Sequence, residues 1–174
     1  FSHYPSGGRV GPPNEEAQLT VVDLFKCPSN GSFSADDAAN SYYGVMGGGP
    51  AATLDYDGCS TLGSQRVYFY NGVFYNNSDT QIAAITDGTS NTYMLGETKY
   101  HQLKVSHPDW YETWASSSQF TGGANLYMNL AATLVGINAL DCDPGMSNCH
   151  QHVSRGFGSF HPSGCHFAMA DASV

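Results

Sequence analysis

The sequence predicts an α+β domain with more strand than helix, in which one or two short helices and long loops surround a small antiparallel sheet. Charged residues make up only 12% of the chain, about half of the usual share, while Gly and Tyr reach 20 and 11 residues. A chain of 174 residues buries about two-thirds of the surface that its unfolded form exposes. Residues 1–174 can therefore form one domain with its own core, and no cofactor is needed.

The charge balance excludes two classes of partner. The formal net charge is -9, with only six Lys and Arg, so the chain repels phosphate backbones and anionic lipid headgroups. No apolar run approaches the ~20 residues that span a bilayer, and the first residues lack the regions of a signal peptide. We expect a soluble fragment or mature form, without nucleic-acid binding and without membrane insertion by this segment.

The five cysteines stand at long spacing, with no C-x-x-C pair of the zinc-ribbon or thioredoxin type. Scattered cysteines, few Lys and many Asn, Gly and Tyr favour an oxidising exterior. Two disulfides and one remaining thiol can be arranged in about fifteen ways. Cys142 and Cys149 close the shortest loop and are the first predicted pair, and Cys27 with Cys59 is the second.

The N-terminal third is predicted to hold an arm, a helix and a strand. Residues 1–14 are rich in Pro and Gly, which predicts an extended surface arm. Asn14 is expected to cap a short helix that starts with two glutamates. Cys27-Pro28 ends this helix, because the residue before Pro avoids the helical region. Residues 41–46 read as a short strand, and the glycines after it as a flexible loop, because no Lys-Ser or Lys-Thr follows them to bind phosphate.

The central third is expected to form a hairpin and then a structural joint. Residues 65–70 alternate as a strand does, and Asn71-Gly72 is the strongest hairpin signal in the chain. An apolar run over 82–85 then stops at the turn dipeptide Asp87-Gly88, and a second apolar run starts at Tyr93. We expect Asp87 and Asn91 to bond local backbone, so that Asp87→Ala costs about 1 kcal/mol, while four side chains enter the core: Ile82, Ile85, Tyr93 and Leu95.

The C-terminal third is predicted less evenly. Residues 99–114 read as a strand and then a loop around Pro108, whereas 122–140 are apolar without a clean period, so helix and strand stay undecided there. In the tail, residues 162–164 predict a turn and 166–170 a strand, which together suggest a terminal hairpin. In that hairpin His161 is expected to bond to Asp171 or to backbone.

Two motifs together carry a family resemblance. The first is Ile85 to Glu97, with Asp-Gly-Thr-Ser-Asn at its centre. The second is Phe157-Gly-Ser-x-His161-Pro-x-Gly, followed after nine residues by Asp171. With Cys27-Pro-Ser and Asn40-Ser-Tyr-Tyr-Gly, they resemble the planctomycete family of pilin-like surface proteins. That family has a prepilin-type N-terminal cleavage and methylation helix, a C-terminal His-x9-Asp-Gly motif and no defined biochemical role. The motif positions of structural interest are Asp87, Gly88, Ser90, Asn91, Glu97, His161 and Asp171.

The resemblance implies a pilin-like globular head, here lacking its N-terminal helix, in a secreted, cell-surface or filament-associated protein related to pseudopilins. It implies no enzyme activity. Residues 3–7 are similar to the segment just after the family's helix, so either that helix was removed or this member assembles without one. Ala172 replaces the Gly of the Asp-Gly motif, which leaves the left-handed turn at that position open.

The sequence offers residues for three kinds of site. His161, Cys165, His166 and Asp171 are zinc-ligand types but straddle a turn, so the His161 to Asp171 bond is the expected use. The resemblance implies calcium as a metal that can hold a loop in a pilin-like head, and the chain is rich in carboxylates and turn carbonyls. Its candidate ligands are Asp55, Asp57, Asp141 and Asp143, whose default state is solvated acidic loops. A Ser90, His161 and Asp171 hydrolase triad has neither a Gly-x-Ser-x-Gly elbow nor another local motif to support it.

The function expected from the sequence is a structural subunit of an extracellular or cell-surface filament. It would self-associate as a homo-oligomer through a neutral surface rich in Tyr and Gly, because Tyr is large, stiff and amphipathic. The alternative is a head that binds a glycan or surface polymer through Trp110, Tyr111 and Trp114, although the same aromatic side chains suit a core.

Overall fold

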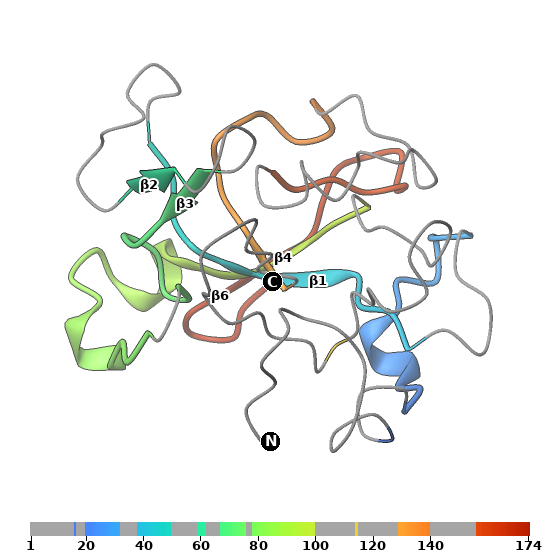
Figure 1. Cartoon of the computed structure of the whole chain (residues 1–174), viewed down its shortest axis with the longest axis horizontal. Helices are drawn as coiled ribbons and strands as arrows, with labels where there is room; N and C mark the ends of the chain where they lie inside the picture. The colour runs from blue at the N-terminus through green and yellow to red at the C-terminus, as the bar shows by residue number, and fades with distance from the viewer. Residues whose placement is uncertain are drawn as a thin grey trace.

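The computed structural model describes residues 16, 20–31, 38–49, 59–61, 67–75, 78–99, 114, 129–139 and 156–174. They include a four-stranded sheet with strand order β5-β1-β4-β6, of which Figure 1 labels β1, β4 and β6. The strands are β1 (Tyr42–Val45), β4 (Tyr93–Glu97), β5 (Leu130–Ala131) and β6 (Phe167–Met169).

The sheet is mixed. β4 pairs antiparallel with both β1 and β6, whereas β1 pairs parallel with β5. The prediction of a small antiparallel sheet is therefore correct for β1, β4 and β6 and wrong at β5. Strand β5 lies within residues 122–140, where the apolar residues follow neither the helix nor the strand period, so the sequence did not predict a strand there. Backbone bonds from Gly44 to Asn129 and from Met46 to Ala131, at 2.8 and 2.9 Å, attach it to β1.

A second sheet pairs β2 (Cys59–Thr61) antiparallel with β3 (Val67–Phe69). The predicted hairpin at Asn71-Gly72 is wrong, because the chain beyond β3 bends back onto the end of β1 instead of starting a strand. The Gly72 N–H donates to the Met46 carbonyl at 3.1 Å, and a Cβ at Gly72 would lie only 2.3 Å from the Gly47 nitrogen. The glycine is thus required for the close approach of two backbones.

Helical structure in the described residues is limited to Glu16 and three single turns of 3-10 helix. These turns are η1 (Asp23–Phe25), η2 (Ile82–Ala84) and η3 (Thr89–Asn91). The helix predicted from Asn14 to Cys27 is not continuous, because residues 20–22 lie outside any helix. A search of the described residues finds no helix of the length and apolar character needed to cross a bilayer.

One face of the main sheet is covered by an aromatic core. Tyr43, Val45, Ala131 and Phe157 form one buried cluster, and Phe167 packs against it. Gly96 makes room for this cluster, because a Cβ there would meet the rings of Phe157 and Phe167 at 2.6 Å. A second buried cluster contains Met46, which directly follows β1, together with Phe69 and Ala132.

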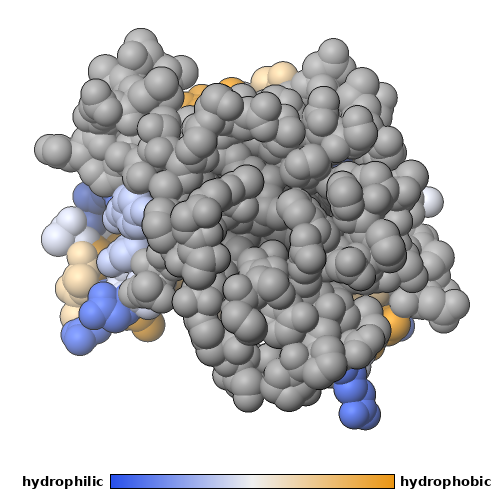
Figure 2. All heavy atoms as spheres, viewed as in Figure 1, coloured by the Kyte–Doolittle hydropathy of each residue, from blue (hydrophilic) through white to orange (hydrophobic). Residues whose placement is uncertain are grey.

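The apolar residues of the central stretch are less buried than predicted. Ile82 is 70% exposed, Tyr93 47% and Leu95 36%, while Ile85 is half-buried. Ile82 lies on η2, and a single 3-10 turn spreads its side chains around the whole axis instead of forming a buried stripe. Figure 1 places the segment with η2 and η3 at the left edge of the molecule, and Figure 2 shows hydrophobic and hydrophilic residues side by side on the surface of that edge.

The loop before β4 is closed by side chains. Asn91 Nδ2 donates to the Asp87 carbonyl at 3.1 Å, and Thr92 Oγ1 donates to the Gly88 carbonyl at 3.0 Å. Gly88 has a φ of 88°, which suits glycine, and Ser90 lies within η3. Among the described contacts, the Asp87 carboxylate forms no bond in this loop, so its part in the turn is played by its backbone.

The tail turns at residues 162–163 as predicted, but it does not form a terminal hairpin, because β6 pairs with β4. After β6 the chain makes a left-handed turn at Ala172, with a φ of 67°. Two backbone bonds close this turn, from Met169 N–H to the Ser173 carbonyl at 2.8 Å and from Ala172 N–H to the Met169 carbonyl at 3.0 Å. The left-handed turn is therefore present with Ala in the place of Gly.

Candidate functional site

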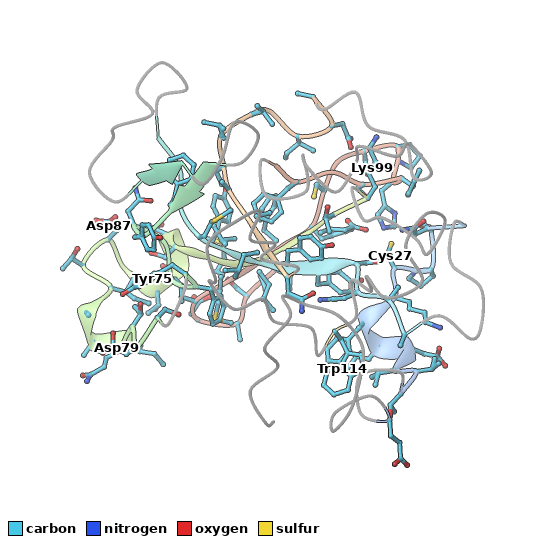
Figure 3. The ribbon with its side chains drawn as sticks, viewed as in Figure 1. Cys27, Tyr75, Asp79, Asp87, Lys99 and Trp114 are labelled. Atoms are coloured by element: carbon cyan, nitrogen blue, oxygen red, sulfur yellow. The ribbon has the colours of Figure 1, made fainter. Side chains whose placement is uncertain are left out.

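Three chemically reactive side chains meet at the end of β4. Cys27 Sγ lies 3.3 Å from His161 Nε2, and the same nitrogen lies 3.3 Å from Glu97 Oε1. One ligand-type atom from each residue lies within 4.8 Å of the others. We call this group the Cys-Glu-His cluster; Figure 3 labels its Cys27.

Glu97 owes its position to the sheet. It is the last residue of β4, lies opposite Tyr42 of β1, and its side chain is only 2% exposed. The backbone around it is fixed from both sides, by Thr98 N–H bonding to the Ser41 carbonyl at 2.8 Å and Gly158 N–H bonding to the Glu97 carbonyl at 3.1 Å. A carboxylate is thus held in a place that water barely reaches, which is costly unless partners surround it.

Cys27 lies in the segment that follows η1, and hydrogen bonds to Ser41 hold this segment against the start of β1. The Ser41 N–H donates to the Phe25 carbonyl at 2.8 Å, and the Cys27 N–H donates to Ser41 Oγ at 3.0 Å. Ser41 thereby connects this segment to the start of β1. The buried thiol of Cys27 is directed by these bonds toward the end of β4.

His161 is held by a backbone bond and by contacts of its ring. Its backbone N–H donates to Ser159 Oγ at 3.0 Å, and its ring atom Nδ1 lies 3.2 Å from Ser29 Oγ. The ring meets that of His166 edge to face, with centroids 5.2 Å apart. The His161 side chain is 29% exposed, so the cluster is reached by solvent on this side.

A second set of contacts surrounds Glu97. The His166 N–H donates to Glu97 Oε2 at 3.3 Å, and the Cys165 thiol donates to the Glu97 backbone carbonyl at 3.2 Å. The two carboxylate oxygens therefore have separate partners, with Oε2 toward the tail backbone and Oε1 toward His161.

Both described thiols stay protonated at neutral pH. Burial raises the pKa of Cys27 above its ordinary value of 9.0, and the Glu97 carboxylate raises it further. Burial also raises the pKa of Cys165 to about 12, again with a contribution from Glu97. Because the thiolate is the nucleophilic form of cysteine, neither group is an activated nucleophile.

The arrangement also differs from a catalytic triad. In a triad the acid bonds the imidazole nitrogen opposite the one that faces the nucleophile. In the Cys-Glu-His cluster Glu97 and Cys27 both approach Nε2 of His161, and Nδ1 faces Ser29. With Cys27 as the nucleophile, the cluster therefore has the composition of an acyl-transfer site without its relay geometry.

An apolar groove lies on the sheet face that carries Tyr42, Gly44 and Leu95, with a volume of about 420 Å³. Trp114 stacks on Phe25 at 5.6 Å between ring centroids, and its Nε1–H donates to the Thr20 carbonyl at 2.9 Å. Figure 3 shows Trp114 beside the segment of η1. The residues that line the groove are Leu24, Phe25, Asn40, Tyr42, Gly44, Phe74, Leu95, Trp114, Asn129 and Leu130.

Several predicted site residues have other roles or lie elsewhere. The expected bond between His161 and Asp171 is wrong, because the Asp171 carboxylate accepts from the Ser173 N–H at 3.0 Å and from its hydroxyl at 2.7 Å. Cys27 carries a free thiol, so its predicted disulfide to Cys59 is not formed. The remaining predicted positions lie outside the described residues: Asp55, Asp57, Asp141, Asp143, Cys142, Cys149, Trp110 and Tyr111.

The partners of His161 were missed because they are distant in sequence; Cys27 is 134 positions away. Grouping by proximity along the chain collected Cys165, His166 and Asp171 instead. A usable signal was present, because Cys27, Glu97 and His161 each belong to one of the short motifs that resemble the pilin-like family.

A protein-family model matches nearly the whole chain. The family model described as "Protein of unknown function (DUF1559)" matches residues 3–174. No curated protein and no solved structure matches the chain significantly. Since the match covers nearly the whole sequence, including every segment of the Cys-Glu-His cluster and the groove, this chain belongs to the DUF1559 family.

Proposed function

We propose that this protein is a structural subunit of an extracellular or cell-surface assembly, pilin-like in design, which self-associates through the groove on its sheet. The observation that carries the proposal is the uncovered apolar face of the sheet. Leu95 lies in β4, one of the two interior strands of the sheet, where apolar side chains are usually covered, and yet it is 36% exposed in the groove. An apolar hollow of this kind is typical of an interaction site.

The rim of the groove supports a second copy of the chain as the occupant. Leu24 lines the groove and is 82% exposed, so an apolar side chain projects beside an apolar hollow. In an isologous interface the same patch occurs on both subunits, and each projecting side chain enters the partner's hollow. None of the residues that line the groove is charged, which lowers the desolvation cost of closing it despite the net charge of -9.

The state of the two described thiols supports a structural role over a cysteine-based catalytic one. Burial raises the pKa of both Cys27 and Cys165, and Cys27 lies on the same imidazole nitrogen of His161 as Glu97 instead of the opposite one. An extracellular location is supported by the composition, with few charged residues and many Gly and Tyr.

The experiment compares two single variants at exposed leucine and isoleucine positions. Leu24→Gln changes the groove rim, and Ile82→Gln changes a side chain that is 70% exposed outside the groove. Because both side chains are exposed, neither change should lower stability by more than ~0.5 kcal/mol. Light scattering coupled to size-exclusion chromatography, with negative-stain microscopy at high concentration, should show oligomers or filaments for the wild type and Ile82→Gln, and monomers for Leu24→Gln. A monomeric wild type refutes the proposal.

A second candidate is a head that binds a glycan or surface polymer in the same groove. The specific observation is that Trp114 and Tyr42 both line it, since aromatic faces stack on sugars. Stabilisation of this head by calcium remains a prediction from the sequence, because its candidate ligands lie outside the described residues. A glycan array distinguishes the two, because binding by a monomer that is lost in Leu24→Gln and kept in Ile82→Gln favours the head.

A further inference from the structure

We propose that Cys27, Glu97 and His161 form a zinc site that fastens the N-terminal segment and the tail to the end of β4. This inference does not depend on self-association. It rests on the distances within the Cys-Glu-His cluster, the orientation of its donor atoms and the burial of Glu97.

The spacing of the ligand atoms fits a tetrahedral ion. Zinc lies about 2.3 Å from thiolate sulfur and about 2.0–2.1 Å from imidazole nitrogen or carboxylate oxygen, so tetrahedral angles separate neighbouring ligand atoms by about 3.3–3.6 Å. Both separations from His161 Nε2 are 3.3 Å, to Cys27 Sγ and to Glu97 Oε1. The third separation, between Cys27 and the Glu97 carboxylate, is at most 4.8 Å, so all three donor atoms can face one ion.

The orientation of His161 supports a metal ligand at Nε2. Its Nδ1 lies 3.2 Å from Ser29 Oγ, a partner for an Nδ1–H donor. Metal-ligating histidines ordinarily use one nitrogen in this way, which fixes the lone pair on the other nitrogen toward the ion. In that tautomer Nε2 and Glu97 Oε1 are both hydrogen-bond acceptors and lie 3.3 Å apart, so neither can donate to the other. A cation between the two atoms would be bound by both.

Glu97 is prepared as a ligand in the same manner. Its Oε2 accepts from the His166 N–H at 3.3 Å, which leaves Oε1 directed at the cluster. The side chain is 2% exposed, and a carboxylate removed from water to this extent is stabilised strongly by a cation. Loading the site replaces the thiol proton of Cys27 with the metal, and this proton is released to solvent.

The donor set selects the metal class. Sulfur, imidazole nitrogen and one carboxylate oxygen suit zinc, whereas calcium takes six to eight oxygen ligands. The His161 side chain is 29% exposed, so a water molecule can complete the tetrahedron from the solvent side. The site joins segments 134 positions apart, and binding free energy at such a site adds directly to folding free energy.

The test uses the full 174-residue chain, reduced and stripped with a chelator. Titration calorimetry with zinc chloride should give one ion per chain and a raised melting temperature. Cys27→Ser and His161→Gln should each lose at least the roughly 10- to 100-fold in affinity that loss of an outer-shell partner costs. The matched control is His166→Gln, which removes an exposed imidazole next to the cluster but no ligand, and it should bind zinc as the wild type does.

Cobalt gives a second readout that a surface histidine cannot imitate. Cobalt bound by the wild type and by His166→Gln should show a thiolate-to-metal charge-transfer band, and Cys27→Ser should not. If Cys27→Ser fails to fold by circular dichroism, the band in the wild type and its loss in His161→Gln decide the question. The proposal is overturned if the wild type binds no zinc, if no charge-transfer band is seen, or if His166→Gln loses as much affinity as His161→Gln.

Discussion

The side-chain amide of Asn91 donates to the backbone carbonyl of Asp87 at 3.1 Å, so the asparagine closes the loop before β4 and the aspartate contributes its main chain. Asn91→Ala should therefore destabilise the protein by about 1 kcal/mol, the usual value of such a hydrogen bond. Asp87→Ala should cost less than ~0.5 kcal/mol, which replaces the larger cost expected from the sequence. Urea denaturation of the two variants measures both values, and a greater cost at Asp87 would contradict this description of the loop.

Ala172→Gly should stabilise the protein. Ala172 has a φ of 67°, a left-handed conformation that costs a residue with a Cβ roughly 1–2 kcal/mol. Glycine removes this strain but loses more entropy on folding, so the net gain should be about 0.5–1 kcal/mol. Thermal unfolding measures the effect. Ala168→Gly, inside β6, is the control and should destabilise, because glycine weakens a strand interior.

Gly96→Ala should be among the most damaging changes of a single methyl group. The new Cβ would lie 2.6 Å from the rings of Phe157 and Phe167, which pack edge to face in the core. Overpacking of this kind costs about 1–3 kcal/mol. Gly136→Ala is the matched control, because its Cβ would have its nearest neighbour at 3.8 Å. Equal denaturation midpoints for the two variants would contradict this prediction, because they would show that the two phenylalanine rings can move to accommodate the new methyl group.

The pKa of Asp171 should lie below its ordinary value of 3.8, because the backbone N–H and then the hydroxyl of Ser173 donate to the carboxylate. A pKa lowered in the folded state contributes stability that is present above the unfolded pKa and is lost as pH falls through the folded pKa. A carboxyl titration by NMR measures the value. Ser173→Ala should raise the pKa part of the way, since the backbone bond remains, and an unchanged pKa would exclude the hydroxyl as a cause.

The sequence predicted those strands and turns that depend mainly on residues adjacent in the chain. The apolar runs that became β1, β4 and β6 were recognised in the sequence, as was the turn at residues 162–163. Strand β5 was not, because two residues that add to an existing strand edge leave no periodic pattern. Asn71-Gly72 has the composition of a hairpin turn, but tertiary contact with the end of β1 decides its conformation.

The candidate site was harder to predict than the strands, because its geometry arises only in the folded chain. His161 was recognised as a residue of interest, and its expected partner, Asp171, was the nearest suitable carboxylate along the tail. Its actual neighbours, Cys27 and Glu97, are brought to it by the pairing of β4 with β1 and β6. The exposure of Leu95 could not be foreseen either, since an apolar residue in a central strand is ordinarily covered.

The strand order of the main sheet also affects how quickly the protein can fold. β1 pairs with β4 and with β5, and β4 pairs with β6, so each pairing joins strands that are separated by long stretches of chain. Loops of this length must close before the pairings stabilise them, which slows folding. The described sheet gains β6 only when Phe167–Met169 has been added to β4. A chain that emerges N-terminus first must therefore keep this edge of β4 from pairing with other chains until Phe167–Met169 has been made.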